Sequence, residues 1–481
     1  MKRIFRGGLL SYGSFLASKL TTFAATLVLA RILVPEDFGL VGYALLMLGF
    51  LTVLKSVGMG RAMIYRQDLD RDAQGEVFVL SMLFAIVFTA VAWALAPAVA
   101  AFFHAPQLTL VARVLSLSFI LNALGEAHES QLKKRMQFGR WLVPEVTFSV
   151  VRGVVSVGLA LAGAGYWSLV WGQLAGDAVH TLTCWTLFPW LPRLRLRRET
   201  ATTLLRYGLH VALLELIALV VINADEVIVG RRLGTAALGI YALAYALPQI
   251  LTINLSSAVS VAVFPAFATV QHDLGALRAG YLDVLRWTSL VLAPVGAGLF
   301  AIAPAFVHTF YTEPWWPMIP VVQALAIYGA IFAIGWSSGD VWLAIGRPDL
   351  QWKLDGAQMV VLVPVLLAGA ALGGITGVAV AQVVAILPYS AARFWLVHRT
   401  LGLGFGELAE RIAVPVTAAA AAAATAIAVR STAGSSLPDG ALLGLQIGVG
   451  AVVYASAVLW FDGDLRARSL PRSRRTPAVE P

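Results

Sequence analysis

The sequence contains few charged residues for its length. Asp, Glu, Lys and Arg make up only 13% of its 481 residues, whereas hydrophobic residues make up 59%. The mean hydropathy of +0.80 lies far above the value of a soluble globular protein. These values indicate a membrane protein. Because apolar blocks with short polar breaks recur along the whole chain, no soluble domain is expected.

Cysteine is nearly absent, and motifs of enzymes and metal sites are missing. The single Cys184 excludes an intrachain disulfide and a Cys metal cluster, and we expect it to be a small buried hydrophobe. The seven histidines show no metal-ligand spacing, and the Gly-rich stretches GAGYWS and LGGITG lack the Lys and Ser/Thr of a P-loop. The sequence therefore predicts no enzyme activity, cofactor or metal.

The formal net charge of +9 does not indicate nucleic acid binding. The basic residues lie between apolar runs instead of forming one polar face, which is typical of membrane topology signals. The basic start MKRIFRGGLLSYGSFLASKL resembles a signal peptide. However, its apolar run continues to about residue 33 and Lys19 interrupts it, so we expect a first membrane helix that is retained.

The apolar runs predict an all-α polytopic membrane protein with about fourteen transmembrane helices. The expected spans are 9–31, 38–60, 76–101, 107–127, 141–163, 166–188, 208–230, 237–263, 285–308, 318–344, 354–372, 375–397, 412–430 and 440–460. With the N-terminus in the cytoplasm, most of the 35 Lys and Arg residues fall in cytoplasmic segments, as the positive-inside rule requires. Both termini are therefore expected in the cytoplasm.

An internal repeat indicates two lobes of equal orientation. Shifting the sequence by 200 residues aligns residues 30–44 with 230–244, with identities at Arg31/Arg231, Leu33/Leu233, Gly39/Gly239 and Ala44/Ala244. Parallel repeats of this kind build some alternating-access transporters. The expected domains are a six-helix lobe (1–190), a basic cytoplasmic linker (191–207), a second six-helix lobe (208–400), two extra helices (401–461) and a basic cytoplasmic tail (462–481).

Five cations lie inside predicted spans, where a charge costs about 2.5–3.5 kcal/mol and usually faces a cavity or a partner. Lys19 and Arg152 lie near mid-depth, which favours a water-filled site over an internal ion pair. For Lys55, a water-filled site and a side chain that extends to the membrane surface are equally favoured. Arg113 and Arg393 are expected to reach the surface along their own side chains.

Polar residues share a helix face with these cations. Ser11, Ser18, Thr22 and Thr26 flank Lys19, and Glu145, Ser149 and Ser156 lie on the face of Arg152. Glu145 is expected to neutralise part of the Arg152 charge. The alternative is that the Ser and Thr residues only permit close helix packing.

The predicted second lobe carries carboxylates. Glu215 lies near mid-depth of span 208–230, and Asp225 and Glu226 lie toward its outer end. A carboxylate facing water can bind a proton or cation and couple its gradient to a lobe movement, which makes the three residues ion-coupling candidates. An interfacial position or a pairing with an arginine is the alternative for each of them.

Seven motifs in register carry a family resemblance. They are LARILVPEDFGLVGYA, LKKRMQFGRWLVPE, LAGAGYWSLVWGQL, INADEVIVGRRLG, VFPAFATVQHD, EPWWPMIPVVQAL and GGITGVAVAQ, over roughly residues 9 to 400. With these motifs the chain resembles the Wzx-type polysaccharide flippases, in particular the WzxC-like branch of the MOP superfamily, which also contains MurJ and the MATE antiporters.

The resemblance implies a flippase in the bacterial inner membrane that alternates between inward-open and outward-open states. The substrate would be a polyprenyl-pyrophosphate-linked oligosaccharide for exopolysaccharide, O-antigen or capsule assembly, with a polysaccharide polymerase and export machinery as further partners. It implies a cationic central cavity for the pyrophosphate, for which Lys19, Lys55 and Arg152 are the candidates by position. Fewer intramembrane arginines than in MurJ make a peptidoglycan precursor the less favoured substrate.

Two other functions remain open at this point. A MATE-like cation-coupled antiporter of small molecules would be expected to have an acidic or aromatic cavity. An O-antigen polymerase or ligase would be expected to have a large periplasmic loop, whereas the outer loops predicted here are short.

Overall fold

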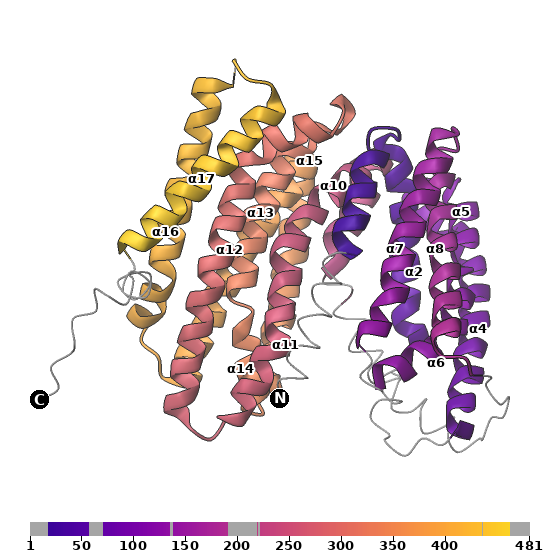
Figure 1. Ribbon diagram of the computed structural model, residues 1–481, viewed down its shortest axis with the longest axis horizontal. Coiled ribbons are helices and arrows are strands. Elements are labelled where there is room, and N and C mark those ends of the chain that lie inside the picture. The colour runs from indigo at the N-terminus through magenta and orange to yellow at the C-terminus, as the bar shows by residue number, and fades with distance from the viewer. Residues whose placement is uncertain are drawn as a thin grey trace, which may run out of the picture. The chain divides into compact units, whose positions relative to one another are not determined.

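The computed structural model describes residues 18–56, 71–134, 138–190, 219, 222–434 and 436–461. Across these ranges the chain forms helices and turns and no strand (Figure 1). Ten of the described helices are long and apolar enough to cross a membrane. The protein is therefore an all-α, multi-pass membrane protein, as predicted. The count of fourteen spans stays a prediction, because much of span 208–230 lies outside the described residues.

The chain divides into two compact units, Met1–Ala242 and Leu243–Pro481. The helices of the first unit are Ser18–Leu29, α2 (Pro35–Ser56), α4 (Arg71–Phe103), α5 (Leu108–Leu115), α6 (Ser118–Lys134), α7 (Phe138–Leu161), α8 (Trp167–Leu187), 222–233 and the first part of α10 (Thr235–Pro248). The predicted linker 191–207, like the predicted tail 462–481, lies outside the described residues, so the predicted lobe boundaries stay predictions.

The second unit continues from α10 and contains the remaining helices. They are η1 (Gln249–Ile253, a π-helical turn), α11 (Asn254–Thr269), α12 (Leu274–Phe310), η2 (Glu313–Trp315), α13 (Met318–Ile334), α14 (Ser337–Ala344), α15 (Pro348–Leu401), α16 (Phe405–Ala433) and α17 (Asp439–Phe461). Its largest core cluster is built around Tyr281, Leu285 and Trp342, which are fully buried. The predicted extra helices, α16 and α17, pack on α12 (Figure 1), and Tyr454 of α17 donates to the Leu290 carbonyl at 2.7 Å.

The segment α15 contains two membrane spans joined by a glycine turn. Gly373 (φ −145°, ψ 18°) and Gly374 (φ 58°, ψ −140°) leave the helical conformation, and Gly374 lies in the left-handed region that favours glycine. The two halves then pack closely, because a Cβ on Gly369 would overlap the Gly377 carbonyl. The turn predicted from LGGITG, between spans 354–372 and 375–397, is confirmed.

The prediction that Arg393 reaches the membrane surface is wrong. Arg393 is 3% exposed, and its Nη2 donates to the Tyr389 hydroxyl at 2.6 Å, which in turn donates to Asp355 at 2.7 Å. The guanidinium also lies 4.7 Å from the centre of the Tyr389 ring and 5.8 Å from that of Phe332. A hydrogen-bonded network inside the second unit therefore holds this cation, so it need not reach water.

Candidate functional site

A buried carboxylate, Asp177 of α8, lies among the charged side chains of the first unit. It is 4% exposed, accepts a hydrogen bond from Ser118 Oγ at 2.5 Å, and lies 3.2 Å from Gln173 Nε2. The positive charges of Lys55 and Arg152 both interact with it. Sequence reasoning missed Asp177. The available signal was a lone carboxylate about halfway along the span 166–188, one helical turn after Gln173.

The positive charge of Lys55, in the last turn of α2, interacts with carboxylates inside the first unit. Lys55 is 7% exposed, and its Nζ lies 5.7 Å from the centre of the Phe119 ring. Its charge interacts with Glu126 of α6 and with Asp177. This burial argues against the alternative in which Lys55 reaches the membrane surface, and its role in a substrate site stays a prediction.

Arg152 of α7 is half-buried, with its guanidinium 5.9 Å from the centre of the Phe148 ring. The carboxylate that interacts with its charge is Asp177, from α8, and not Glu145 as predicted. Glu145 instead lies beside Glu129 and His180. The charges of Lys55 and Arg152, which are far apart in sequence, therefore both interact with the carboxylate of Asp177.

Lys19 lies on the helix Ser18–Leu29 and is exposed. Ser18, its neighbour, is buried and lies 2.5 Å from Ser149 Oγ on α7. The two predicted polar faces thus meet at Ser18 and Ser149, which places Lys19 and Arg152 on neighbouring helices. Thr22 and Thr26 hydrogen-bond to carbonyls of their own helix. The predicted Ser11 lies outside the described residues.

Replacing Asp177 by Asn should strongly destabilise the first unit. The substitution removes the negative charge that interacts with Lys55 and Arg152 and weakens the hydrogen bond from Ser118, and a hydrogen bond to a charged group is worth about 1.5–3 kcal/mol. We expect a clear fall in the melting temperature of the detergent-solubilised protein. The matched control is Asp439→Asn, at a carboxylate that is 51% exposed and lies 3.9 Å from His308 Nδ1, which should have little effect. Equal melting temperatures for Asp177→Asn and wild type would contradict the pairing.

The predicted ion-coupling residues have different surroundings. Asp225 is 2% exposed and accepts a hydrogen bond from the Tyr241 hydroxyl at 2.7 Å. Glu226 lines a cavity of about 260 Å³ with Asn223, and apolar residues of α2 such as Leu45 form much of the rest of the wall. Glu215 lies outside the described residues. The geometry thus favours Glu226 over Asp225 as a group that can meet a solvent ion.

The helices α2 and α10 cross at two equivalent glycines. A Cβ on Gly39 would overlap the carbonyl oxygen of Thr235, and a Cβ on Gly239 would overlap that of Pro35. The two contacts are equivalent, because the 200-residue shift found in the sequence relates Gly39 to Gly239 and Pro35 to Thr235. The structure therefore confirms the repeat at this place, and the crossing explains why the start of α10 belongs to the first compact unit.

Further contacts join helix 222–233 to α2 and to the end of α4. The Tyr43 hydroxyl donates to the Gly230 carbonyl at 2.8 Å, and Arg231 Nη1 lies 2.8 Å from His104 Nδ1. The Arg231 guanidinium also lies 5.2 Å from the centre of the Phe102 ring. In the predicted topology all these residues lie toward the outer side of the membrane.

The fold agrees with the comparisons with known proteins. Residues 28–320 match the model of a family described as "Polysaccharide biosynthesis protein". The chain belongs to the polysaccharide biosynthesis protein family. The resemblance to WzxC-like proteins inferred from the seven motifs is thereby confirmed.

Curated relatives match this member of the polysaccharide biosynthesis protein family over most of their lengths. Teichuronic acid biosynthesis protein TuaB of Bacillus subtilis is 24% identical over 84% of this chain and 84% of its own. Lipopolysaccharide biosynthesis protein WzxC of Escherichia coli is 24% identical, with coverage of 81% and 80%. Succinoglycan biosynthesis transport protein ExoT of Rhizobium meliloti is 25% identical, with coverage of 95% and 93%.

Solved structures establish the fold of this family member. Lipid II flippase MurJ, in an inward closed conformation, matches with a TM-score of 0.77 and 13% identity, over 95% of this chain and all of MurJ. An inward-facing multidrug resistance MATE transporter of the MOP superfamily matches with a TM-score of 0.68 and 16% identity, over 80% of this chain and 94% of its own. The chain therefore has the fold of the MOP superfamily, as predicted.

Proposed function

We propose that this protein is a flippase for polyprenyl-pyrophosphate-linked oligosaccharides. It would move them from the cytoplasmic to the periplasmic leaflet of the bacterial inner membrane, for the assembly of exopolysaccharide, O-antigen or capsule. Its membership of the polysaccharide biosynthesis protein family and the names of its relatives support this substrate class. The distribution of Lys and Arg supports a cytoplasmic location of both termini.

The observation that carries the proposal is the group of cations in the first unit. The charges of Lys55 and Arg152 both interact with the buried carboxylate of Asp177, and Lys19 is exposed on the helix that packs against α7. A diphosphate needs compensating positive charge to cross an apolar region, and Lys and Arg bind phosphate by charge-assisted hydrogen bonds. Lys19 is the leading pyrophosphate ligand, and Arg152 and Lys55 support the positive potential near it.

The crossing of α2 and α10 suits a contact that opens and closes during transport. Backbones in direct contact at Gly39 and Gly239 can separate without unpacking large side chains. In the proposed cycle these helices are in contact when the outer side is closed, and they part to release the oligosaccharide. A polysaccharide polymerase and export machinery would then receive it.

A cation-coupled antiporter with the same fold is the second candidate. The cavity that contains Glu226 favours it, because a carboxylate in an apolar wall can exchange a proton or cation. In the flippase proposal the same Glu226 would couple the ion gradient to transport. A polymerase or ligase has no comparable support in the described residues.

Deleting the gene in its native bacterium tests the proposed function. We expect the secreted glycan to be lost and polyprenyl-pyrophosphate-linked oligosaccharides to accumulate, detected by mass spectrometry of the lipid extract. The wild-type gene on a plasmid should restore export. Normal glycan export in the deletion strain, or hypersensitivity to cationic drugs with unchanged lipid-linked intermediates, would contradict the proposal and favour the antiporter.

A further inference from the structure

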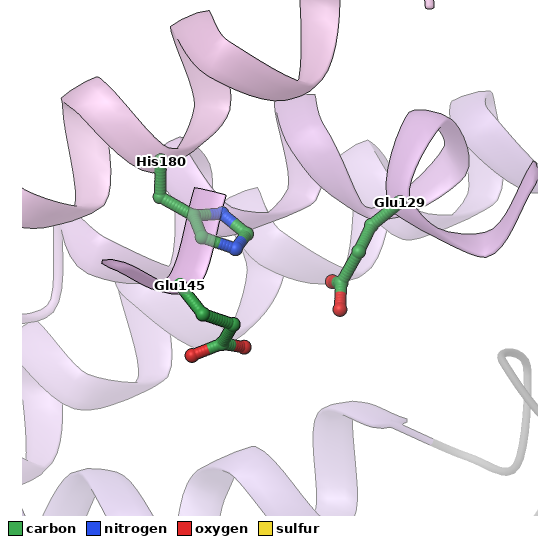
Figure 2. Close-up of side chains that lie close together, drawn as sticks. All are labelled: Glu129, Glu145 and His180. Atoms are coloured by element: carbon green, nitrogen blue, oxygen red, sulfur yellow. The ribbon is translucent and has the colours of Figure 1, made fainter. Parts of the chain in front are cut away.

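Three side chains with metal-ligating atoms meet in the first unit outside the group around Asp177. Glu129 of α6, Glu145 of α7 and His180 of α8 place one ligand atom each within 4.8 Å of the other two. Figure 2 shows the imidazole and the two carboxylates turned toward one space between the three helices. All three side chains are half-buried. They come from three separate helices, so the cluster results from the fold and not from a run of acidic residues.

Neighbouring residues fix the orientation of the imidazole. His180 Nδ1 lies 4.0 Å from the thiol sulfur of Cys184, one helical turn further along α8, and Phe148 packs edge-on against the ring at a centroid distance of 6.5 Å. Cys184 is buried, as the sequence predicts. With Nδ1 facing the sulfur, Nε2 is the nitrogen available to a ligand. A contact that holds one ring nitrogen and orients the other is typical of metal-binding histidines.

The helix turn that carries Glu145 is also fixed. The backbone carbonyl of Glu145 accepts hydrogen bonds from Ser149 Oγ at 3.1 Å and from Ser18 Oγ at 3.4 Å. Helix α8 packs against both α6 and α7, so the three ligating residues are held by one continuous packing arrangement. A site built on packed helices keeps its geometry better than one built on loops.

The chemistry of the three donors selects a class of cation. Two carboxylates repel each other at this separation, and a divalent cation between them would remove the repulsion. Mg²⁺ and Ca²⁺ prefer oxygen ligands only, whereas an imidazole suits transition metals such as Zn²⁺, and carboxylates also suit Mn²⁺, so the mixed set of donors fits a divalent transition metal. Three protein ligands also leave a coordination position for water or another oxygen donor, as in many zinc sites.

We propose that Glu129, Glu145 and His180 bind one divalent transition-metal ion of the Zn²⁺ and Mn²⁺ class, and that the ion ties α6, α7 and α8 together. The proposal does not depend on the transported substrate, because it concerns the first unit by itself. His180 lies one helical turn from Asp177, so the ion would also stiffen the segment of α8 that faces Lys55 and Arg152.

Metal titration of the purified full-length protein tests the site. The protein in detergent is treated with EDTA, freed of chelator and titrated with Mn²⁺ followed by electron paramagnetic resonance, with Zn²⁺ added as competitor. We expect one Mn²⁺ per chain, displaced by one Zn²⁺, and a higher melting temperature with Zn²⁺. Glu145→Gln and His180→Gln should each weaken binding about tenfold or more.

Matched controls separate this site from adventitious binding. His272→Gln and Glu313→Gln change the same residue types at exposed positions of the second unit and should leave binding unchanged. If the wild type binds no stoichiometric metal, or if Glu145→Gln and His180→Gln bind it as tightly as the wild type, the proposal is wrong. The stoichiometry of the wild-type protein shows, without any variant, whether a metal binds at all. If either Glu145→Gln or His180→Gln does not fold, the other variant shows whether these side chains bind the metal. Glu129→Gln is a third variant for the same purpose.

Discussion

Lys19→Ala should abolish export of the glycan while the amount of protein in the membrane stays unchanged. In the proposed complex Lys19 pairs with the pyrophosphate of the substrate. Removing one partner of such a desolvated charge pair costs about 2–5 kcal/mol, which corresponds to roughly a 30-fold loss or more in affinity for the substrate. Lys19 is exposed on its helix, and substitutions at exposed positions usually change stability by only about 0.5 kcal/mol. Export is measured as secreted polysaccharide in a deletion strain that carries the variant gene, and protein amount by immunoblotting of membranes.

Two further variants show whether the charge at position 19 matters. Lys19→Arg keeps the charge and should retain most of the export. Lys353→Ala removes a lysine that is 61% exposed and paired with Asp349 in the second unit, and it should export normally. Wild-type export by Lys19→Ala would show that this residue does not bind the pyrophosphate.

Gly39→Ala, and likewise Gly239→Ala, should reduce export through the helix crossing. A single added methyl group overlaps a backbone carbonyl of the other helix, and such overpacking costs about 1–3 kcal/mol. If the crossing forms in only one transport state, that energy shifts the equilibrium between the states by about 5- to 150-fold. We expect export to fall by a similar factor, with the two variants behaving alike because their contacts are reciprocal.

Gly158→Ala in α7 is the matched control, since a Cβ there meets no atom within 4 Å. It should export glycan and melt like the wild type, or slightly higher, because alanine favours a helix. Normal export by both Gly39→Ala and Gly239→Ala would mean that the close crossing is not needed for transport. A loss in one variant alone would contradict the reciprocal role of the two positions.

Features that depend on local sequence could be predicted. Apolar runs between charged breaks located the helices, because a bilayer demands about 20 apolar residues per span. The paired glycines 373 and 374 marked the turn inside α15, since Gly374 adopts a conformation that other residues avoid. The repeat was visible from a few identities, and Gly39 and Gly239 were among them because backbone contact requires glycine at both positions.

Contacts between helices could not be predicted from one sequence. Asp177 interacts with the charges of both Lys55 and Arg152, and Glu145 is the wrong partner for Arg152 because the interacting carboxylate comes from another helix, α8. Arg393 was expected to reach the membrane surface, since its distance from the span end was known but its bond to Tyr389 was not. The cluster of Glu129, Glu145 and His180 shows no motif spacing because each residue belongs to a different helix.

Transfer of the lipid-linked oligosaccharide in proteoliposomes tests the central claim most directly. The oligosaccharides that accumulate in the deletion strain are purified and placed in vesicles with the protein, and their exposure at the outer surface is followed with a membrane-impermeant glycosidase. We expect vesicles with wild-type protein to expose the inner pool within minutes, and vesicles with Lys19→Ala or without protein to retain it. An inner pool that stays protected in the presence of correctly folded wild-type protein would contradict the proposed flippase.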